Sequence, residues 1–201
     1  MIVIVDYGMG NLKSVFNAFT LLCYSVKISD SPEEIINADR LVLPGVGAFG
    51  DCMNGLIERG ISDAVRDFIS KGNPFLGICV GMQLLFTRSF EFGEQHGLGY
   101  FTGDIKRFED DGVHKVPHMG WNSLKILKET PLLNGILDGS FVYFVHSYYA
   151  PLMEYTVASC DYVNNFSAMV LRDNIAAVQF HPEKSQSNGL KILKNFAEWK
   201  C

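Results

Sequence analysis

Short β-branched runs alternate with helical patterns through the first 90 residues, and this alternation limits the fold more than any other feature of the sequence. The sequence predicts buried parallel strands at residues 1–5, 24–29, 40–44 and 73–78. It predicts helices at residues 11–23, 32–38, 51–71 and 80–90, the third of which Gly60 could interrupt. Strands that alternate with helices in this way form a mostly parallel sheet with helices on both faces. We therefore expect a doubly wound α/β fold.

The second half of the chain is predicted to be rich in strands that polar turns connect. The predicted strand segments are residues 103–108, 114–127, 140–150, 155–162, 166–173 and 175–181, and a final helix is predicted at about 187–200. No linker, repeat or low-complexity segment separates the two halves. We therefore expect a single domain over residues 1–201, with flanking helices, a mostly parallel central sheet and a β-rich second half.

Charge and cysteine content exclude several classes of function. The net charge of −5 is spread along the 201 residues without a basic run, which argues against nucleic acid or an anionic membrane as the main partner. The five cysteines are scattered and include no C-x-x-C pair, which favours reduced thiols over disulfides or a zinc site. The amino terminus lacks the basic region of a signal peptide, and no apolar stretch is long enough to cross a bilayer. These features predict a cytoplasmic protein without a bound metal.

A cysteine stands between two glycines at the predicted junction of strand 73–78 and helix 80–90. The stretch Gly77-Ile78-Cys79-Val80-Gly81 has the form of a nucleophile elbow in which cysteine replaces serine. The glycines allow a sharp turn, and the amino terminus of the following helix would favour a thiolate. A tight turn around a small core cysteine is the alternative interpretation.

The histidine best placed to act as a base is His181, at the end of the strand segment 175–181. A thiol nucleophile needs a base, and the base needs an acceptor that orients it. Glu183 follows two residues later, and in an extended segment residues i and i+2 point to the same side. We therefore expect Glu183 to accept a hydrogen bond from the ring of His181, although a solvated strand end would also fit these residues.

Attack on an acyl carbon also needs N–H donors for the developing oxyanion. One is the backbone N–H of Val80, directly after the cysteine. A second could come from the glycine-rich stretch PGVGAFG at 44–50, which follows a predicted strand and which is otherwise read as an ordinary turn. Both loops follow the carboxyl ends of parallel strands, where open α/β sheets bind their ligands.

A nucleotide-binding interpretation is weaker. The stretch VDYGMGNLKS contains G-x-G after the first strand, but Lys13 stands where the dinucleotide fingerprint has its third glycine. The chain also contains no G-x-x-x-x-G-K-[ST] motif. We therefore expect no nucleotide cofactor, and no other cofactor is indicated.

Three stretches, GICVGMQLLF, PGVGAFG and VQFHPEKS, resemble the class I (triad-type) glutamine amidotransferases, whose fold is flavodoxin-like. Three more, DYGMGNL, HMGWN and FVHSYY, resemble the glutaminase subunits of imidazole glycerol phosphate synthases, which act in histidine biosynthesis. The resemblance runs from residue 2 to the final helix and therefore covers essentially the whole chain.

The resemblance implies a role for each matching position. Cys79 would attack the side-chain amide of L-glutamine, His181 would shuttle the proton, and Glu183 would hold His181. The remaining positions match the oxyanion donors Val46, after a peptide flip, and Val80, the substrate contacts Gly47, Gln83, Glu91, Ser147 and Tyr148, and the partner-face residues Asn11, Met119, Trp121, Tyr143 and Lys184.

The resemblance also implies a partner. In this family the ammonia passes into a (β/α)8-barrel cyclase subunit, and the two chains form a heterodimer. The cyclase uses the ammonia on a phosphoribosyl-formimino carboxamide ribonucleotide (PRFAR), and the products are imidazole glycerol phosphate and an aminoimidazole carboxamide ribotide (AICAR).

Three alternatives remain open at this point. A paralogue could supply ammonia to another acceptor synthase, for example in surface-sugar amidation. A cysteine hydrolase or peptidase could use the same elbow, and a non-catalytic subunit could keep the fold alone.

Overall fold

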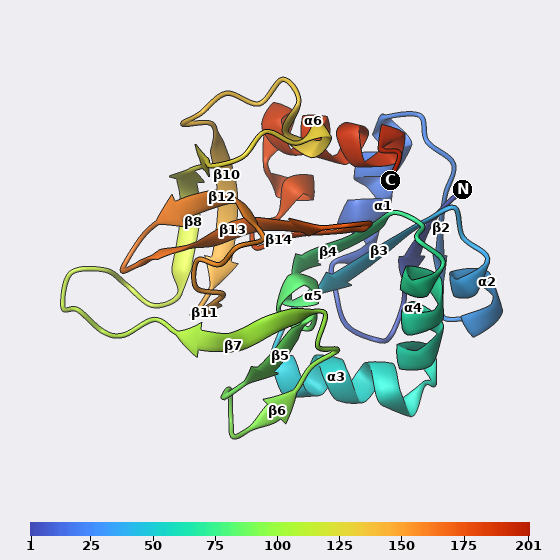
Figure 1. Cartoon of the computed structure of the whole chain (residues 1–201), viewed down its shortest axis with the longest axis horizontal. Coiled ribbons are helices and arrows are strands. Elements are labelled where there is room, and N and C mark those ends of the chain that lie inside the picture. Colours follow the sequence, from blue (N-terminus) through green and yellow to red (C-terminus); the bar gives the residue numbers. More distant parts are fainter.

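The computed structural model describes residues 1–201, and its first half alternates strands with helices as predicted (Figure 1). The elements in chain order are β1 (Ile2–Val5), α1 (Leu12–Leu21), β2 (Val26–Ser29), α2 (Pro32–Ile36), β3 (Arg40–Gly45), α3 (Phe49–Glu58), α4 (Ile61–Ser70), β4 (Phe75–Cys79) and α5 (Val80–Gln83). Gly60 lies between α3 and α4 with a φ of +66°, so the predicted interruption at this glycine is confirmed.

The second half is β-rich, as predicted. Its elements are β5 (Phe86–Ser89), β6 (Gln95–His96), β7 (Phe101–Arg107), β8 (His118–Ser123), β9 (Lys125–Ile126), the 3-10 turn η1 (Pro131–Leu133), β10 (Phe141–His146), β11 (Tyr148–Tyr149), β12 (Thr156–Asp161), β13 (Asn165–Arg172), β14 (Ile175–Val178), the 3-10 turn η2 (Pro182–Lys184) and α6 (Gln186–Glu198).

The central sheet has eight strands in the order β2-β1-β3-β4-β14-β13-β12-β9. The pairings from β2 to β14 are parallel, and those from β14 to β9 are antiparallel. Helices α1 and α6 cover one face, while α3 and α4 cover the other (Figure 1). The predicted doubly wound α/β fold is therefore confirmed. Two smaller sheets, β11-β7-β5-β6 and β10-β8, lie beyond the carboxyl ends of the parallel strands.

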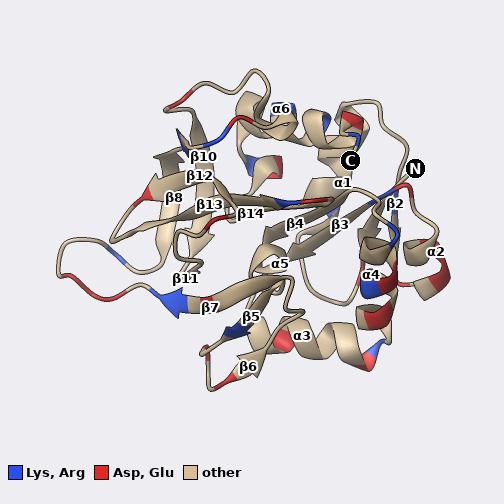
Figure 2. Cartoon of the chain, in the orientation of Figure 1, with Lys and Arg blue, Asp and Glu red and all other residues tan.

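The apolar patterns of the sequence explain these layers. The strands β1 and β4 are buried along their whole length, as parallel strands between two helical layers must be. Helix α4 buries Ile61, Ala64, Val65, Phe68 and Ile69, which share one helical face. Lys and Arg are dispersed among acidic residues and do not gather into one basic surface (Figure 2). None of the helices is long and apolar enough to cross a lipid bilayer.

The predicted helix 80–90 is wrong. Helix α5 ends at Gln83, and the chain continues into β5, which pairs with β6 and β7. The carbonyl groups of Leu84 and Leu85 accept hydrogen bonds from the N–H groups of Leu98 and Phe101. These carbonyl groups are therefore bound to a later segment of the chain and do not accept the hydrogen bonds of a further helical turn. Cys79 therefore precedes a four-residue helix, which offers free N–H groups but only a small dipole.

The turn at Cys79 depends on the two glycines beside it. Cys79 has a φ of +56°, a left-handed conformation that costs an ordinary residue of the order of 1–3 kcal/mol. A Cβ atom on Gly81 would lie 1.9 Å from the carbonyl oxygen of Leu43 in β3, and one on Gly77 would lie 2.7 Å from the oxygen of Gly81. Both contacts are with backbone atoms, one in β3 and one in α5. Glycine is therefore required on either side of the cysteine.

We predict that changing Gly81 to Ala lowers the free energy of unfolding by more than ~3 kcal/mol, because the backbone of β3 cannot move away from the added methyl group. Gly72→Ala is the matched control, since Gly72 has a φ of +79° and open space around it. Its cost should be only about 1–2 kcal/mol of left-handed strain. Denaturant unfolding measures both values, and equal losses would contradict this account of the turn.

Candidate active site

The predicted site residues converge on one cavity of about 210 Å³ at the carboxyl ends of β3, β4 and β14. Eleven residues line it: Val46, Gly47, Cys79, Val80, Gln83, Glu91, Val145, His146, Ser147, Tyr148 and His181. Nine of them were singled out from the sequence as catalytic, oxyanion or substrate-contacting positions. Glu183 lies behind His181, so the structure gathers all ten of these predicted positions into one place.

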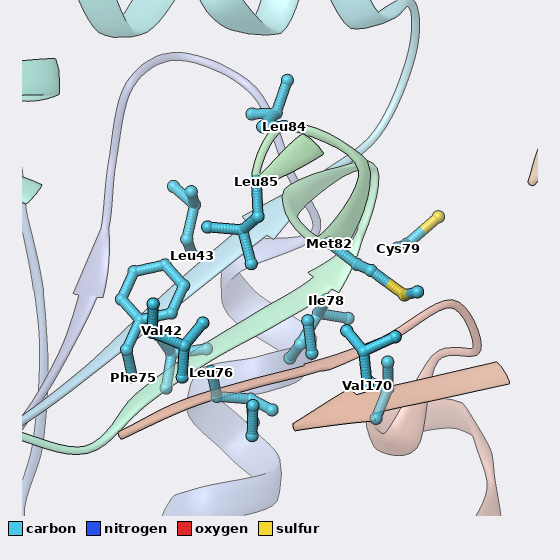
Figure 3. Packing of buried hydrophobic residues seen from close by; sticks show 14 of the residues in the cluster. Val42, Leu43, Phe75, Leu76, Ile78, Cys79, Met82, Leu84, Leu85 and Val170 are labelled. Atoms are coloured by element: carbon cyan, nitrogen blue, oxygen red, sulfur yellow. The ribbon is translucent and has the colours of Figure 1, made fainter. Parts of the chain in front are cut away.

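Cys79 presents its sulfur to this cavity. The side chains of Val42, Leu43, Phe75 and Leu76 pack together beneath the turn, and the sulfur of Cys79 points away from them (Figure 3). The residue is only 3% exposed. Its Sγ lies 3.9 Å from the carbonyl oxygen of Val145 and 3.9 Å from the amide nitrogen of Gln179. The sulfur is thus shielded from bulk water but open to a molecule in the cavity.

His181 and Glu183 form a buried pair. Nδ1 of His181 donates to Oε1 of Glu183 at 2.9 Å, and the two side chains are 3% and 1% exposed. The expected hydrogen bond is present, but the expected extended path is wrong, because Glu183 lies in the 3-10 turn η2. Since Nδ1 carries its proton toward the carboxylate, Nε2 is the nitrogen left for catalysis. It has no hydrogen-bond partner in the protein.

The backbone of β10 fixes this pair in position. The N–H of His181 donates to the carbonyl of Tyr143 at 2.9 Å. The hydroxyl of Ser185 donates to the carbonyl of His181 at 2.6 Å and accepts from the N–H of Tyr143 at 2.9 Å. Ser185 is 1% exposed. Two hydrogen bonds therefore attach the turn that carries His181 and Glu183 to β10, and the third closes the turn itself. Strand β10 also forms one wall of the cavity.

The electrostatics of the site favour a charged imidazole. Burial alone lowers the pKa of His181, but the interactions with Cys79 and Glu183 outweigh burial and raise the pKa above its ordinary value of 6.5. Because the folded pKa exceeds the unfolded one, the charged ring stabilises the fold fully below about pH 6.5. This stabilisation is lost as the pH rises through the folded pKa.

Unused N–H groups gather in the loop after β3. The amides of Val46, Gly47 and Ala48 make no hydrogen bond within the protein. Gly47 has a φ of +92°, which glycine adopts without strain. The buried thiol of Cys52 donates to the carbonyl of Val46 at 3.4 Å. This contact holds the carboxyl side of Val46, whereas the Val46 N–H on the other side of the residue has no hydrogen bond in the protein.

Val80 is the first residue of α5, and its N–H belongs to the end of the helix that has no partner within it. Val80 and Val46 both line the cavity beside Cys79. Residues Gly45 and Cys79 are paired in the parallel sheet, so the two loops begin at the same level of the sheet. The arrangement therefore offers two sets of backbone donors to an oxygen atom near the sulfur.

Gln83 and Glu91 bring acceptors to the other end of the cavity. Both contacts of the Gln83 amide nitrogen are internal, to the carbonyl of Tyr148 and to Oε1 of Gln179, each at 3.0 Å. Its Oε1 makes no hydrogen bond in the protein and remains available. Oε2 of Glu91 accepts from the N–H of Phe49 at 2.8 Å, at the start of α3. A carboxylate and an amide oxygen are acceptors suited to an ammonium group.

The predicted partner-face residues lie mainly on the outer face of the two-stranded sheet. Met119 and Trp121 of β8 are 63% and 45% exposed, and they pair with Val145 and Tyr143 of β10. The Trp121 and Tyr143 rings meet edge to face, and Nζ of Lys184 lies 5.9 Å from the Tyr143 ring centre. Neither strand contains a charged residue (Figure 2). Asn11 lies apart from these strands, at the start of α1, which contacts η2.

The sequence interpretation missed several residues that hold the site together. Gln179 is completely buried and links Gln83 to Cys79. A signal existed for it, since Gln179 precedes His181 by two residues in the predicted strand segment 175–181, where residues i and i+2 are expected on the same side. Ser185, Cys52 and His146 had no such signal, because their roles depend on contacts between distant segments.

We predict that Glu183→Gln and Cys79→Ala each lower the pKa of His181, because each change removes a negative partner of the imidazolium. An NMR titration that follows the His181 ring protons measures the value. Cys160→Ala is the control, since it removes a buried thiol of β12 that is no partner of His181. An unchanged pKa after removal of the Cys79 thiol would contradict the pairing of these two side chains.

Comparisons with known proteins agree with this geometry. The family described as glutamine amidotransferase class-I matches residues 3–199. An imidazole glycerol phosphate synthase subunit HisH from Syntrophotalea carbinolica is 51% identical over 98% of this chain and 100% of its own length. A HisH subunit from Caldanaerobacter subterraneus is 50% identical over the whole of both chains.

A solved structure shows the same fold at lower identity. The crystal structure of a glutamine amidotransferase has a TM-score of 0.75 and 21% identity, and the match covers 98% of this chain and 97% of that one. At this identity the likeness concerns the fold alone. The family match and the two HisH relatives span nearly the full chain, and the protein accordingly belongs to the class-I glutamine amidotransferase family, in the group of the HisH subunits.

Proposed function

We propose that the chain hydrolyses L-glutamine to L-glutamate and ammonia with Cys79 as the nucleophile. One observation carries the proposal. The sulfur of Cys79, on a strained turn, lines the same cavity as His181, whose Nδ1 is bound to Glu183. A nucleophile, a base and a group that orients the base are the three parts of a catalytic triad. Membership of the amidotransferase family identifies the side-chain amide of glutamine as the substrate bond.

The reaction follows from the positions of these groups. The thiolate attacks the amide carbon and forms a C–S bond, while the carbonyl oxygen takes the negative charge. The N–H of Val80, and that of Val46 after the Gly45–Val46 peptide rotates, donate to this oxygen. His181 gives its Nε2 proton to the leaving nitrogen, and the C–N bond breaks to release ammonia. A water molecule deprotonated by His181 then cleaves the thioester, which releases glutamate and restores Cys79. Loss of one oxyanion donor typically costs about 2.7–4 kcal/mol.

The amino-acid end of glutamine would lie against Gln83, Glu91 and the Ser147–Tyr148 segment. Oε1 of Gln83 and the carboxylate of Glu91 suit its ammonium group, as described above. The free N–H groups near Gly47 suit its carboxylate. We assign these residues as substrate contacts because they line the cavity that contains the sulfur.

The ammonia serves a (β/α)8-barrel cyclase subunit, with which this chain forms the heterodimeric imidazole glycerol phosphate synthase of histidine biosynthesis. The complex converts PRFAR into imidazole glycerol phosphate and AICAR. The identity of about 50% to HisH subunits over full chain lengths supports this assignment. The uncharged outer face of β8 and β10 is a surface that a partner would cover, and we assign Met119, Trp121, Tyr143, Lys184 and Asn11 to the interface.

Two further assignments complete the proposal. The chain acts as one amidotransferase domain, residues 1–201, which a continuous hydrophobic core from Ile2 to Trp199 supports. It acts in the cytoplasm, which suits its five free cysteines.

The other candidates are less well supported. The HisH relatives favour the cyclase acceptor over a sugar-amidating synthase. A peptidase needs an open cleft for a polypeptide substrate, whereas Cys79 is 3% exposed and lines a small cavity. A purely structural subunit would have no need of a strained cysteine beside a buried His–Glu pair.

We predict that Cys79→Ala in the complex with the cyclase abolishes glutamine-dependent synthesis of imidazole glycerol phosphate and leaves ammonia-dependent synthesis intact. The thiol is required to release ammonia but not to use it. Product formation with glutamine or with an ammonium salt measures the two activities. Cys160→Ala, which removes a remote buried thiol, should retain both. Loss of both activities in Cys79→Ala would contradict the assignment.

A further inference from the structure

A second pair of histidines is buried beside the active-site cavity, and the proposed reaction does not use it. His118 of β8 and His146 of β10 are directly paired across the two-stranded sheet. They are 3% and 6% exposed. Nδ1 of His118 lies 3.0 Å from Nε2 of His146, and Nδ1 of His146 lies 2.8 Å from the carbonyl oxygen of Tyr148. The amide nitrogen of Asn122 lies 3.3 Å from Nε2 of His118.

The carbonyl oxygen of Tyr148, the last acceptor in this series of hydrogen bonds, determines which ring nitrogen of each histidine carries a proton. A carbonyl oxygen only accepts, so Nδ1 of His146 carries the hydrogen and Nε2 of the same ring is an acceptor. Nδ1 of His118 must therefore donate to it. Nε2 of His118 is then an acceptor for the amide of Asn122, which also donates to the carbonyl of Asp161 at 2.8 Å. We call this series, from Asn122 through His118 and His146 to the Tyr148 carbonyl, the histidine relay.

The surroundings keep both rings neutral, as the relay requires. The ring of His118 lies between the rings of Phe144 and Tyr162, stacked at centroid distances of 4.8 and 4.0 Å. Burial lowers the pKa of His118 to about 4 and that of His146 to about 3. A proton on Nε2 of His146 would place two donors against each other and break the relay.

The relay ends where the substrate is expected to bind. The Tyr148 carbonyl accepts from the amide of Gln83 as well as from His146, so one oxygen joins the relay to a substrate contact. His146, Ser147 and Tyr148 all line the cavity. His146 ends β10 and Tyr148 begins β11, so Ser147 alone separates the two strands. The pairing of Tyr148 with Arg107 holds the backbone of this segment, and the hydrogen bond from His146 acts directly on the carbonyl oxygen that orients Gln83.

We propose that His118 is a positioning residue for glutamine binding, and that its Nδ1–H holds His146 in the orientation that fixes the Tyr148 carbonyl and Gln83. This proposal rests on the proposed glutaminase function. His118 does not line the cavity, so it acts only through His146. Its neighbours Met119 and Trp121 lie on the opposite face of the same strand. One strand therefore carries both the expected docking surface and the start of the relay.

NMR spectroscopy of the full-length wild-type chain tests the relay without reference to activity. An N–H···N hydrogen bond transmits a two-bond coupling between its nitrogens, so we expect a ¹⁵N–¹⁵N coupling between Nδ1 of His118 and Nε2 of His146. We also expect Nδ1 of His146 to carry the ring proton. Absence of the coupling, or a proton on Nε2 of His146, would overturn the proposal.

Two near-isosteric variants, His118→Leu and His118→Asn, then separate positioning from packing in the complex with the cyclase. Both lose the stacked ring, but the asparagine can still donate from its amide to His146. We expect His118→Leu to raise the KM for glutamine about tenfold, which corresponds to ~1.4 kcal/mol, with little change in kcat. His118→Asn should recover most of the loss.

Phe108→Leu is the packing control, since Phe108 contacts both histidine rings but makes no hydrogen bond with them. It should lower the unfolding temperature without raising KM. Equal KM values for the leucine and asparagine variants, or an unchanged KM in both, would overturn the positioning role. A wild-type complex that hydrolyses no glutamine although the coupling is present would instead refute the proposed function, and the positioning role with it.

Discussion

The left-handed backbone of Cys79 is the constraint on which the rest of the site depends. The strain at this residue is held because Gly81 lies directly against the carbonyl of Leu43 in the neighbouring strand. The parallel sheet thereby fixes the sulfur at the level where the loop after β3 presents its free N–H groups. A strained residue persists only where its surroundings determine it fully. Here the surroundings are two glycines and two paired strands.

Strand β10 contacts three parts of the molecule that the proposed function needs: the catalytic base, the substrate segment and the expected partner surface. Its Tyr143 binds the His181 turn through backbone hydrogen bonds, its His146 belongs to the histidine relay, and its outer face continues the apolar surface of β8. A partner that covers this surface would therefore contact the strand that holds both the base and the substrate segment. The two-stranded sheet lies beyond the carboxyl ends of the parallel strands (Figure 1), the same end of the central sheet at which the cavity opens.

The sequence predicted the parts of this structure that local pattern and chemistry determine. Alternating strands and helices identified the fold, and Gly77-Ile78-Cys79-Val80-Gly81 identified the turn. The helix after Cys79 was predicted too long, because pairing of β5 with β6 and β7 overrides the helical pattern of residues 84–90. Glu183 was predicted to meet His181, but through an extended path and not through a 3-10 turn. The contacts of Ser185, Cys52 and His118 join segments that are distant in the sequence, and no residue spacing predicts such contacts.

Covalent labelling with a diazo-ketone analogue of glutamine tests the central claim most directly. Five free cysteines compete for the label: Cys23 and Cys201 are exposed, whereas Cys52, Cys79 and Cys160 are buried. Burial raises the pKa of Cys52 to about 11 and that of Cys160 to about 12, which keeps both thiols protonated. Mass spectrometry should find one label per chain, on Cys79, and excess glutamine should prevent it. A label on any other cysteine, or labelling of Cys79 that glutamine does not prevent, would contradict the account.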